Sequence, residues 1–258
     1  MTALAIVLGL AIGVIVGAVG GGGAILALPV LVYVLGEPVD PASTASLIVV
    51  ALAAAVGASS LARHGHVCWR LALTFSLPAA AGSLLGTIGN AAVSGPVLIL
   101  AFVPVMLIAS GATWRRSGMP SAGEDRTCPP VPLSRVVPAG LAVGLLTGFF
   151  GVGGGFVIVP VLTLWFGVTF RRAVATSLVI ITITGVVALA GHLVAGTTID
   201  AGVTASLGAA TALGALAGTL VSQQLPQRAL GRGFALVVAA VAVFLLVDTL
   251  AFGGPPGS

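Results

Sequence analysis

Two glycine clusters interrupt apolar stretches of the chain and expose backbone groups that could bind a ligand. The first, residues 20–23, lies in GAVGGGGAILALPVLVYVLG (17–36), and the second, residues 151–155, lies in GFFGVGGGFVIVPVLTLWFG (148–167). Glycine weakens a helix interior by about 1 kcal/mol relative to alanine, so each cluster predicts a break in a helix. A helix that starts after such a break offers unpaired N–H groups and a partial positive charge. These groups can bind an anion where glycine lets it approach the backbone.

Small hydroxyl side chains follow each glycine cluster and could donate to an oxyanion. Ser43, Thr44 and Ser46 follow the first cluster, and Thr176 and Ser177 follow the second. Together the glycines and hydroxyls form a candidate substrate-binding set: Gly20, Gly22, Gly23, Ala24, Ser46, Gly151, Gly153, Gly154, Gly155, Thr176 and Ser177.

A simpler function for these residues is helix packing, and it stays open as an alternative. Glycine in membrane helices often lets two helices approach closely, and buried hydroxyls often bond to the backbone of their own helix. We expect the closest approach of a ligand at Gly22 and Gly23. At Gly21, the matching residue of the second cluster is Val152, which indicates that a side chain fits there.

Charged residues are scarce, and their places favour an anion site without a buried charge. Only 6% of the 258 residues are charged; the ten basic residues are all arginine, and none lies at the centre of an apolar segment. A cation site in a membrane usually has a central Asp or Glu. The one acidic residue inside an apolar segment, Asp248, lies near its end. Without lysine the chain cannot hold a Walker-type phosphate loop, and we expect no cofactor, no metal and no enzymatic activity.

The composition identifies the class of protein that positions these residues. The chain is 58% hydrophobic, whereas soluble proteins carry about 25% charged residues, so we predict a polytopic helical membrane protein. The net charge of +4 comes from arginines between apolar runs, which indicates membrane topology rather than nucleic-acid binding. The start, MTALAIVLGL, lacks the positive region of a signal peptide, and we expect it to be the first membrane segment.

Ten apolar segments and one polar stretch divide the chain. Two segments, 24–36 and 154–167, are shorter than the roughly 20 residues of a spanning helix, and each follows a glycine cluster. We predict membrane repeat 1 over 1–113, a cytoplasmic linker over 114–134 and membrane repeat 2 over 135–258. The ten apolar segments are 3–19, 24–36, 42–62, 71–90, 94–113, 135–150, 154–167, 173–195, 201–222 and 232–252.

The two halves resemble each other. A shift of 131 residues aligns the two glycine clusters, and with one inserted residue it also aligns Gly86-Thr87 with Gly218-Thr219. The matches concentrate on glycine and proline, which favours an internal duplication. The pairs are Gly17/Gly148, Gly20/Gly151, Gly22/Gly153, Gly23/Gly154, Pro29/Pro160, Val30/Val161, Leu31/Leu162, Gly36/Gly167, Ala42/Ala173, Ser46/Ser177 and Leu47/Leu178.

The arginines predict the orientation of the two repeats, because cytoplasmic loops carry an excess of positive charge. If every hydrophobic unit crossed once, the clusters at 171–172 and 228–232 would lie outside. If 3–36 and 135–167 instead enter and return on one side, those two clusters lie inside with the clusters at 63–70 and 115–135. Each half then has a hairpin and three crossings, and the odd number inverts the second half.

We therefore predict an all-α polytopic membrane protein with two inverted repeats. Each repeat is a re-entrant, broken-helix hairpin plus three transmembrane helices, and the two glycine tips meet near the membrane midplane.

The cysteines and histidines suggest one further alternative. His64, His66 and Cys68 in HGHVC resemble a metal-binding cluster, which would suit an integral-membrane, metal-dependent enzyme. The neighbouring arginines instead favour a surface turn on the cytoplasmic side. Cys68 and Cys128 fall in different connecting segments, and we expect two free thiols rather than a disulfide.

The duplicated GxxGxGGG…P signature, followed by an A…SL segment, resembles that of the sulfite exporter TauE/SafE family, also called the 4-toluene sulfonate uptake permease family. The resemblance covers nearly the whole chain; GFFGVGGGFVIVPVL follows the family pattern closely, and GAVGGGGAILALPVL departs from it mainly at Gly21. It implies transport of sulfite, sulfoacetate or another organosulfonate, in a family that holds both importers and exporters.

These inferences combine into one expectation. We expect a secondary transporter of a small sulfur-containing oxyanion in the bacterial cytoplasmic (inner) membrane; a passive anion channel and an assembly subunit without a substrate stay open as alternatives. The expected partners are the small anion and the lipid bilayer, with a homodimer left open and no nucleic acid.

Overall fold

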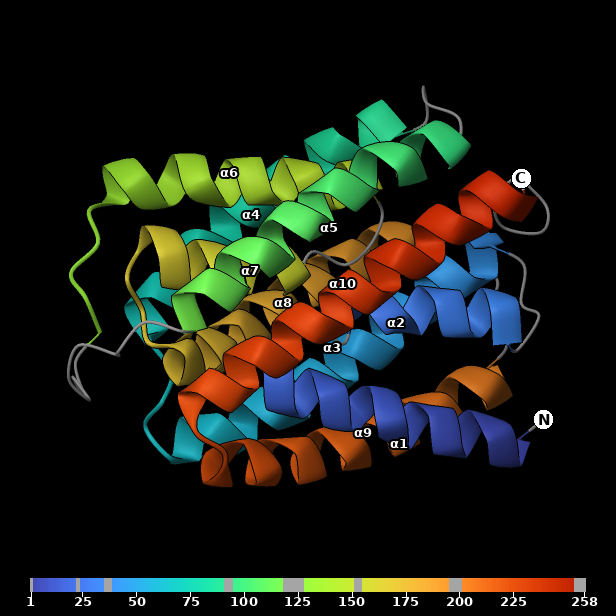
Figure 1. Ribbon diagram of the computed structural model, residues 1–258, viewed down its shortest axis with the longest axis horizontal. Coiled ribbons are helices and arrows are strands. Elements are labelled where there is room, and N and C mark those ends of the chain that lie inside the picture. The colour runs from blue at the N-terminus through green and yellow to red at the C-terminus, as the bar shows by residue number, and fades with distance from the viewer. Residues whose placement is uncertain are drawn as a thin grey trace.

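The computed structural model describes residues 2–21, 24–34, 39–90, 95–117, 128–150, 155–194 and 201–252. All regular elements in this part of the chain are helices, as the composition predicts (Figure 1). In chain order they are α1 (Thr2–Val19), α2 (Ala24–Pro29), η2 (Val30–Val34), α3 (Val39–Arg63), α4 (Trp69–Asn90), α5 (Gly95–Ser117), α6 (Leu133–Phe150), α7 (Gly155–Pro160), η3 (Val161–Trp165), α8 (Phe170–Val194), α9 (Ala201–Gln224) and α10 (Gln227–Phe252).

Several helices are long and apolar enough to cross a membrane. Among the residues described, five stretches meet this criterion by length and composition, and two further apolar helices are shorter, Ile6–Val19 and Gly155–Trp165. The chain is therefore a multi-pass helical membrane protein. The five long stretches are Thr44–Arg63, Leu133–Phe150, Phe170–Val187, Thr204–Gln224 and Gln227–Ala251.

Each short segment after a glycine cluster changes its helix type halfway. Six α-helical residues are followed by five π-helical residues, α2 by η2 and α7 by η3, with Pro29 and Pro160 at the change. Proline removes an N–H donor and crowds the carbonyl four residues earlier, which favours a wider turn. The hydroxyl of Thr163 donates to the carbonyls of Val159 (2.9 Å) and Pro160 (3.1 Å) and so satisfies part of the disturbed backbone. The sequence predicts the two short segments but not their π-helical halves.

Glycines bring α1 and α9 into backbone contact. A Cβ atom added at Gly13 or Gly17 would overlap with the backbone of α9, 2.8 Å from the nitrogen and 2.9 Å from the Cα of Ala215, respectively. From the other side, Gly214 and Gly218 face the backbone of α1 in the same way. The two helices carry small-xxx-small pairs that interlock, as expected for helices that associate in a membrane.

The same arrangement recurs between α4 and α6. Gly144 and Gly148 of α6 face the backbone of α4, and Gly82 and Gly86 of α4 face the backbone of α6. These glycines match those of the α1–α9 pair under the repeat shift described above. The first helix of each half therefore packs on the third long helix of the other half.

Aromatic side chains hold α5, α6 and α7 together in the core. Phe102 of α5 contacts Phe150, the last residue of α6, and Phe156 of α7, with ring centroids 4.9 and 5.1 Å apart. All three side chains are buried. One residue of α5 thus packs against both α6 and α7.

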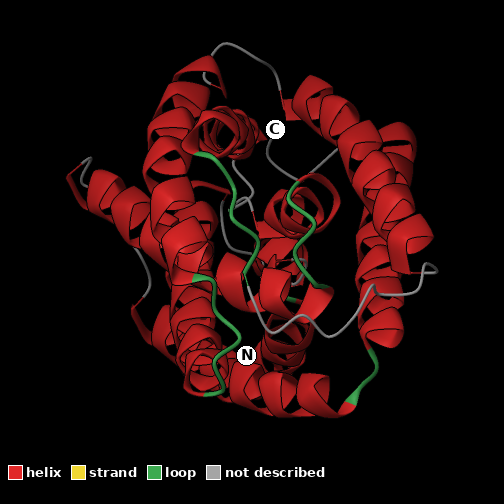
Figure 2. Cartoon of the chain, turned by 90° about the vertical axis from the view of Figure 1, so that its left-hand side faces the viewer, coloured by secondary structure: helices red, strands yellow, loops and turns green. Residues whose placement is uncertain are grey.

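The arginine clusters lie at one end of the molecule, where the described loops 64–68, 128–132, 166–169 and 225–226 gather (Figure 2). Arg171 donates from Nη2 to the carbonyls of Gln223 (3.3 Å) and Leu225 (3.0 Å), which lie at and just beyond the end of α9. The guanidinium of Arg232 lies 5.5 Å from the ring centroid of Trp114. We call this region the arginine end.

The fold predicts that the glycine contacts stabilise the protein. Gly144→Ala would force the backbones of α6 and α4 apart, and overpacking of this kind costs about 1–3 kcal/mol. We expect a lower apparent Tm in thermal unfolding of the detergent-solubilised protein. Gly111→Ala is the matched control, because nothing lies within 4 Å of the added Cβ. Equal Tm values for the two variants would contradict the packing role.

Candidate functional site

The first glycine cluster ends a helix, as the sequence analysis predicts. Gly20 follows the last residue of α1 with φ +78°, a left-handed conformation that side chains disfavour. Its N–H donates to the carbonyl of Val16 (2.8 Å) and so completes the last turn. Gly20 therefore has the conformation of a glycine at a helix C-terminus.

The backbone of the first cluster touches the start of α7. A Cβ atom added at Gly21 would overlap with the carbonyl carbon and oxygen of Gly155, and one added at Gly155 would lie 2.5 Å from the Cα of Gly21. The expectation that a side chain fits at Gly21 is therefore wrong. The 131-residue shift pairs Gly21 with Val152, but the space at Gly21 is set by the backbone of Gly155, from the other half of the chain.

One face of α8 lies beside Gly20 and Gly155. A Cβ on Gly20 would lie 3.0 Å from Ser177 Oγ and 3.3 Å from Val174 Cγ1, and a Cβ on Gly155 would lie 2.6 Å from Ile181 Cδ1. Positions 174, 177 and 181 share one side of a helix. Ser177 is the polar residue of these three; it is fully buried, and its hydroxyl donates to the Val174 carbonyl (2.8 Å).

The described interior contains hydroxyls but no buried charge. Among the described residues, every buried polar side chain is Ser or Thr, and none is Asp, Glu, Arg or His. An anion in this interior would need backbone N–H groups and hydroxyls as its donors, because an unpartnered buried charge is very costly.

The remaining candidate residues have different surroundings. Thr176 is fully buried, and its Oγ1 accepts the N–H of Cys68 (3.1 Å), so its hydroxyl supports the residue before α4. Ser46 and Thr44 are buried in α3, and Ala24 begins α2. Five candidates lie outside the residues that the structure describes: Gly22, Gly23, Gly151, Gly153 and Gly154.

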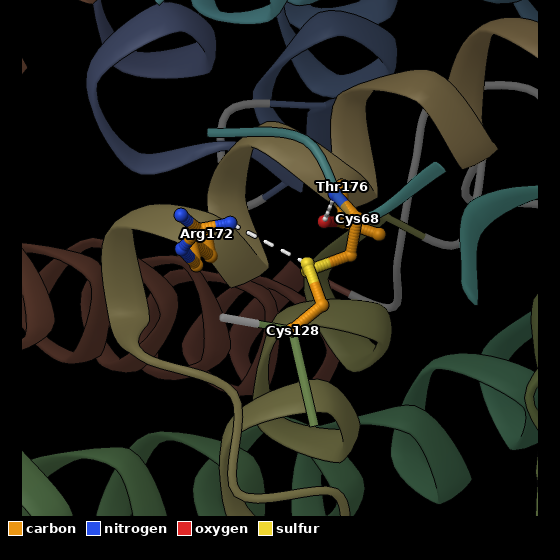
Figure 3. The surroundings of a disulfide bond; sticks show 4 residues. All are labelled: Cys68, Cys128, Arg172 and Thr176. Carbon is orange, nitrogen blue, oxygen red and sulfur yellow. Dashed lines mark hydrogen bonds between the residues drawn. A yellow bond between two sulfur atoms is a disulfide. The ribbon is translucent and has the colours of Figure 1, made fainter. Parts of the chain in front are cut away.

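Cys68 and Cys128 form a disulfide, which corrects the expectation of two free thiols (Figure 3). Their Cα atoms lie 5.7 Å apart although 60 positions separate them in the sequence. The sequence does not reveal that the turn before α4 neighbours the segment before α6. The bond joins the linker between the halves to the arginine end of the first half.

The disulfide also argues against a metal site at His64, His66 and Cys68. Cys68 is part of the disulfide and has no thiolate to offer, and the rings of His64 and His66 lie 6.4 Å apart. Within the described residues no group of three or more His, Cys, Asp or Glu side chains could hold a metal ion. HGHVC forms the turn between α3 and α4, with His64 and Gly65 exposed as the surface-turn interpretation predicts, whereas Val67 and Cys68 are buried.

The turn lies in a positive field. The pKa of His66 is lowered by burial and by the positive charges of Arg171 and Arg172, with a smaller effect from His64. Its Nδ1 is buried without a hydrogen-bond partner. We therefore expect His66 to be neutral at pH 7, with protonation below pH 6.5 destabilising the folded turn.

The chain is similar to several proteins that are named as probable membrane transporters. It is 31% identical over 245 residues to a probable membrane transporter protein of Xylella fastidiosa (strain 9a5c), with 91% of each chain covered. It is 27% identical over 212 residues to the probable membrane transporter protein YunE of Bacillus subtilis (strain 168), covering 74% of this chain and 78% of that one. A probable membrane transporter protein of Methanocaldococcus jannaschii is 26% identical over 199 residues, with 75% of this chain and 73% of that one covered.

No solved structure matches the chain significantly. The family described as Sulfite exporter TauE/SafE matches residues 5–245, nearly the whole length. With the broken apolar helices and the duplicated glycine clusters described above, this match identifies the chain as a member of the sulfite exporter TauE/SafE family.

Proposed function

We propose that this protein is an inverted-repeat secondary transporter of a small sulfur-containing oxyanion. Sulfite, sulfoacetate and other organosulfonates are the candidate substrates, and the membrane is the bacterial cytoplasmic (inner) membrane. The family description supports sulfite as the first substrate to test. The observation that carries the site is the contact between Gly21 and Gly155, which brings the two glycine clusters together.

The inverted arrangement is supported by the packing of the helices. The α1–α9 and α4–α6 pairs use equivalent glycines of opposite halves, as a two-fold relation between inverted repeats requires. In Figure 1, α1 and the α2 segment both extend toward one end of the molecule, whereas α6 and the α7 segment extend toward the other. The gathering of the arginine clusters at one end supports the same topology.

The binding mechanism uses the backbone rather than charged side chains. Helices begin at Ala24 and Gly155, directly after the two breaks, and the first N–H groups of a helix have no partner within it. The Ser177 hydroxyl beside Gly20 can turn from the Val174 carbonyl to donate to an anion. Hydrogen bonds to an anion in an apolar interior are strong, and they can also be released because no fixed positive charge traps the ion.

A carrier differs from a channel in its kinetics. Purified protein in proteoliposomes should take up labelled sulfite with a saturable rate, and unlabelled sulfite on the opposite side should accelerate that uptake by counterflow. Flux that rises linearly with concentration, without counterflow, would favour the passive anion channel. No sulfite movement above that of empty liposomes would remove the proposed substrate.

The contact between the glycine clusters predicts a defect in transport. Gly21→Ala should lower the initial rate of sulfite uptake about tenfold or more, because the methyl group overlaps with the Gly155 backbone and displaces the two segments. Gly111→Ala, which adds a methyl group in open space, should transport normally at equal reconstituted amounts. Normal uptake by Gly21→Ala would separate the contact from function.

The Ser177 hydroxyl predicts a defect in binding. Ser177→Ala should raise KM for sulfite about tenfold or more, because a hydrogen bond to an ion contributes about 1.5–3 kcal/mol. Ser76→Ala is the matched control, since Ser76 is equally buried and also donates to the carbonyl of its own helix, that of Ala72 (2.7 Å). The same KM in both variants would exclude Ser177 from the site.

The proposed topology predicts that the starts of α9 and α10 lie on opposite sides of the membrane. In a chain with Cys68→Ser and Cys128→Ser, a membrane-impermeant maleimide added to intact cells should label Gly202→Cys but not Arg228→Cys. Both positions are exposed, Gly202 near the start of α9 and Arg228 near the start of α10. Labelling of Arg228→Cys from outside would reverse the orientation, and labelling of both would reject the three-crossing arrangement.

A further inference from the structure

We propose that the Cys68–Cys128 disulfide is a reaction site for nucleophilic sulfur anions, with sulfite as the representative reagent. Cys128 receives the incoming sulfur, and Cys68 leaves as a thiolate. The site lies at the arginine end, and its reactivity does not require that sulfite is the transported substrate.

The two sulfur atoms differ in access. Cys68 is 2% exposed, whereas Cys128 is exposed on the segment that leads into α6. Thiol–disulfide exchange requires the nucleophile to reach the sulfur that it attacks. An external anion therefore reaches Cys128 and not Cys68.

A positive charge stands beside the attacked sulfur. Nη1 of Arg172 lies 3.4 Å from Cys128 Sγ, and the guanidinium points toward that atom (Figure 3). After burial, the charges of Arg171 and Arg172 are the next causes that lower the pKa of His66, two residues before Cys68, so their field reaches the turn. This field attracts an anionic nucleophile and then pairs with the negative group that remains on Cys128.

The position of Cys68 before α4 also favours its departure as a thiolate. Cys68 directly precedes α4, and its carbonyl accepts the N–H of Ala72 (2.8 Å) in the first turn of this 22-residue helix. The positive end of the helix dipole lies at this terminus and stabilises a negative charge on the leaving sulfur. A stabilised thiolate is a better leaving group in disulfide exchange.

The proposed reaction balances without a further reagent. The sulfur lone pair of sulfite forms a bond to Cys128 Sγ as the Cys68–Cys128 bond breaks, and the electron pair of that bond stays on Cys68 Sγ. The dianion and the disulfide become one S-sulfonate anion on Cys128 and one thiolate on Cys68. The thiolate then takes a proton from water.

The direct test uses the purified full-length protein in detergent with sodium sulfite. Iodoacetamide then blocks new thiols, and peptide mass spectrometry locates each group. We expect S-sulfonate on Cys128 and carbamidomethyl on Cys68. The opposite assignment would overturn the proposal, as would an unreacted disulfide under conditions in which the SDS-unfolded protein reacts.

A second experiment tests the role of Arg172. Arg172→Gln should slow the reaction with sulfite about tenfold but leave the rate with an uncharged trialkylphosphine unchanged, because only the anion is attracted by the arginine. Arg228→Gln is the control, an exposed arginine of the same end that should react as the unaltered protein does. Equal effects on both reagents would assign Arg172 a structural role and reject the proposed attraction.

These measurements are independent of transport because no membrane separates two compartments. A protein that reacts with sulfite at Cys128 but does not carry it across proteoliposomes would retain this inference and lose the proposed substrate. A protein that carries sulfite with an inert disulfide would do the reverse.

Discussion

A polypeptide that breaks its helix inside a membrane must satisfy the freed backbone groups within the protein, because lipid offers no hydrogen-bond partner. Each broken segment therefore needs protein on all sides. In this chain Gly21 contacts Gly155, Gly20 and Gly155 each lie beside one face of α8, and Phe102 packs against both α6 and α7. Glycine permits this close contact, because a methyl group at Gly21 would overlap with the backbone of Gly155.

The enclosure depends in turn on pairs of long helices. The entering arms α1 and α6 are fixed by backbone contact with α9 and α4, which belong to the opposite halves. Without a hydrophobic force between helices in lipid, such contacts rely on dispersion and on small residues that allow it. Glycines of the same segment thus have two structural roles: Gly17 packs against α9, and Gly20 ends α1.

Much of the fold could be predicted from apolar runs, since the predicted segments 71–90 and 201–222 lie within α4 and α9 and differ from them by a few residues. The tolerance assigned to Gly21 and the free thiols of Cys68 and Cys128 were wrong for a common reason. Both predictions depend on which distant segment of the chain contacts these residues. A single sequence does not indicate such contacts when most of the neighbouring residues are apolar. The π-helical turns escaped prediction because proline indicates a disturbance of a helix but not its form. Ser177 could be found because it repeats Ser46 after a break, yet its position beside Gly20 comes only from the fold.

The packing of α1 and α6 on helices of the other half has a consequence for biosynthesis. α1 is synthesised before α9, on which it packs, and the helices from α2 to α8 are made between them. Nascent α1 must therefore reside in the bilayer or beside an insertion factor while most of the chain is still being synthesised. Neither half can form these contacts alone, and a chain that ends before α9 would leave the face of α1 at Gly13 and Gly17 without its packing partner.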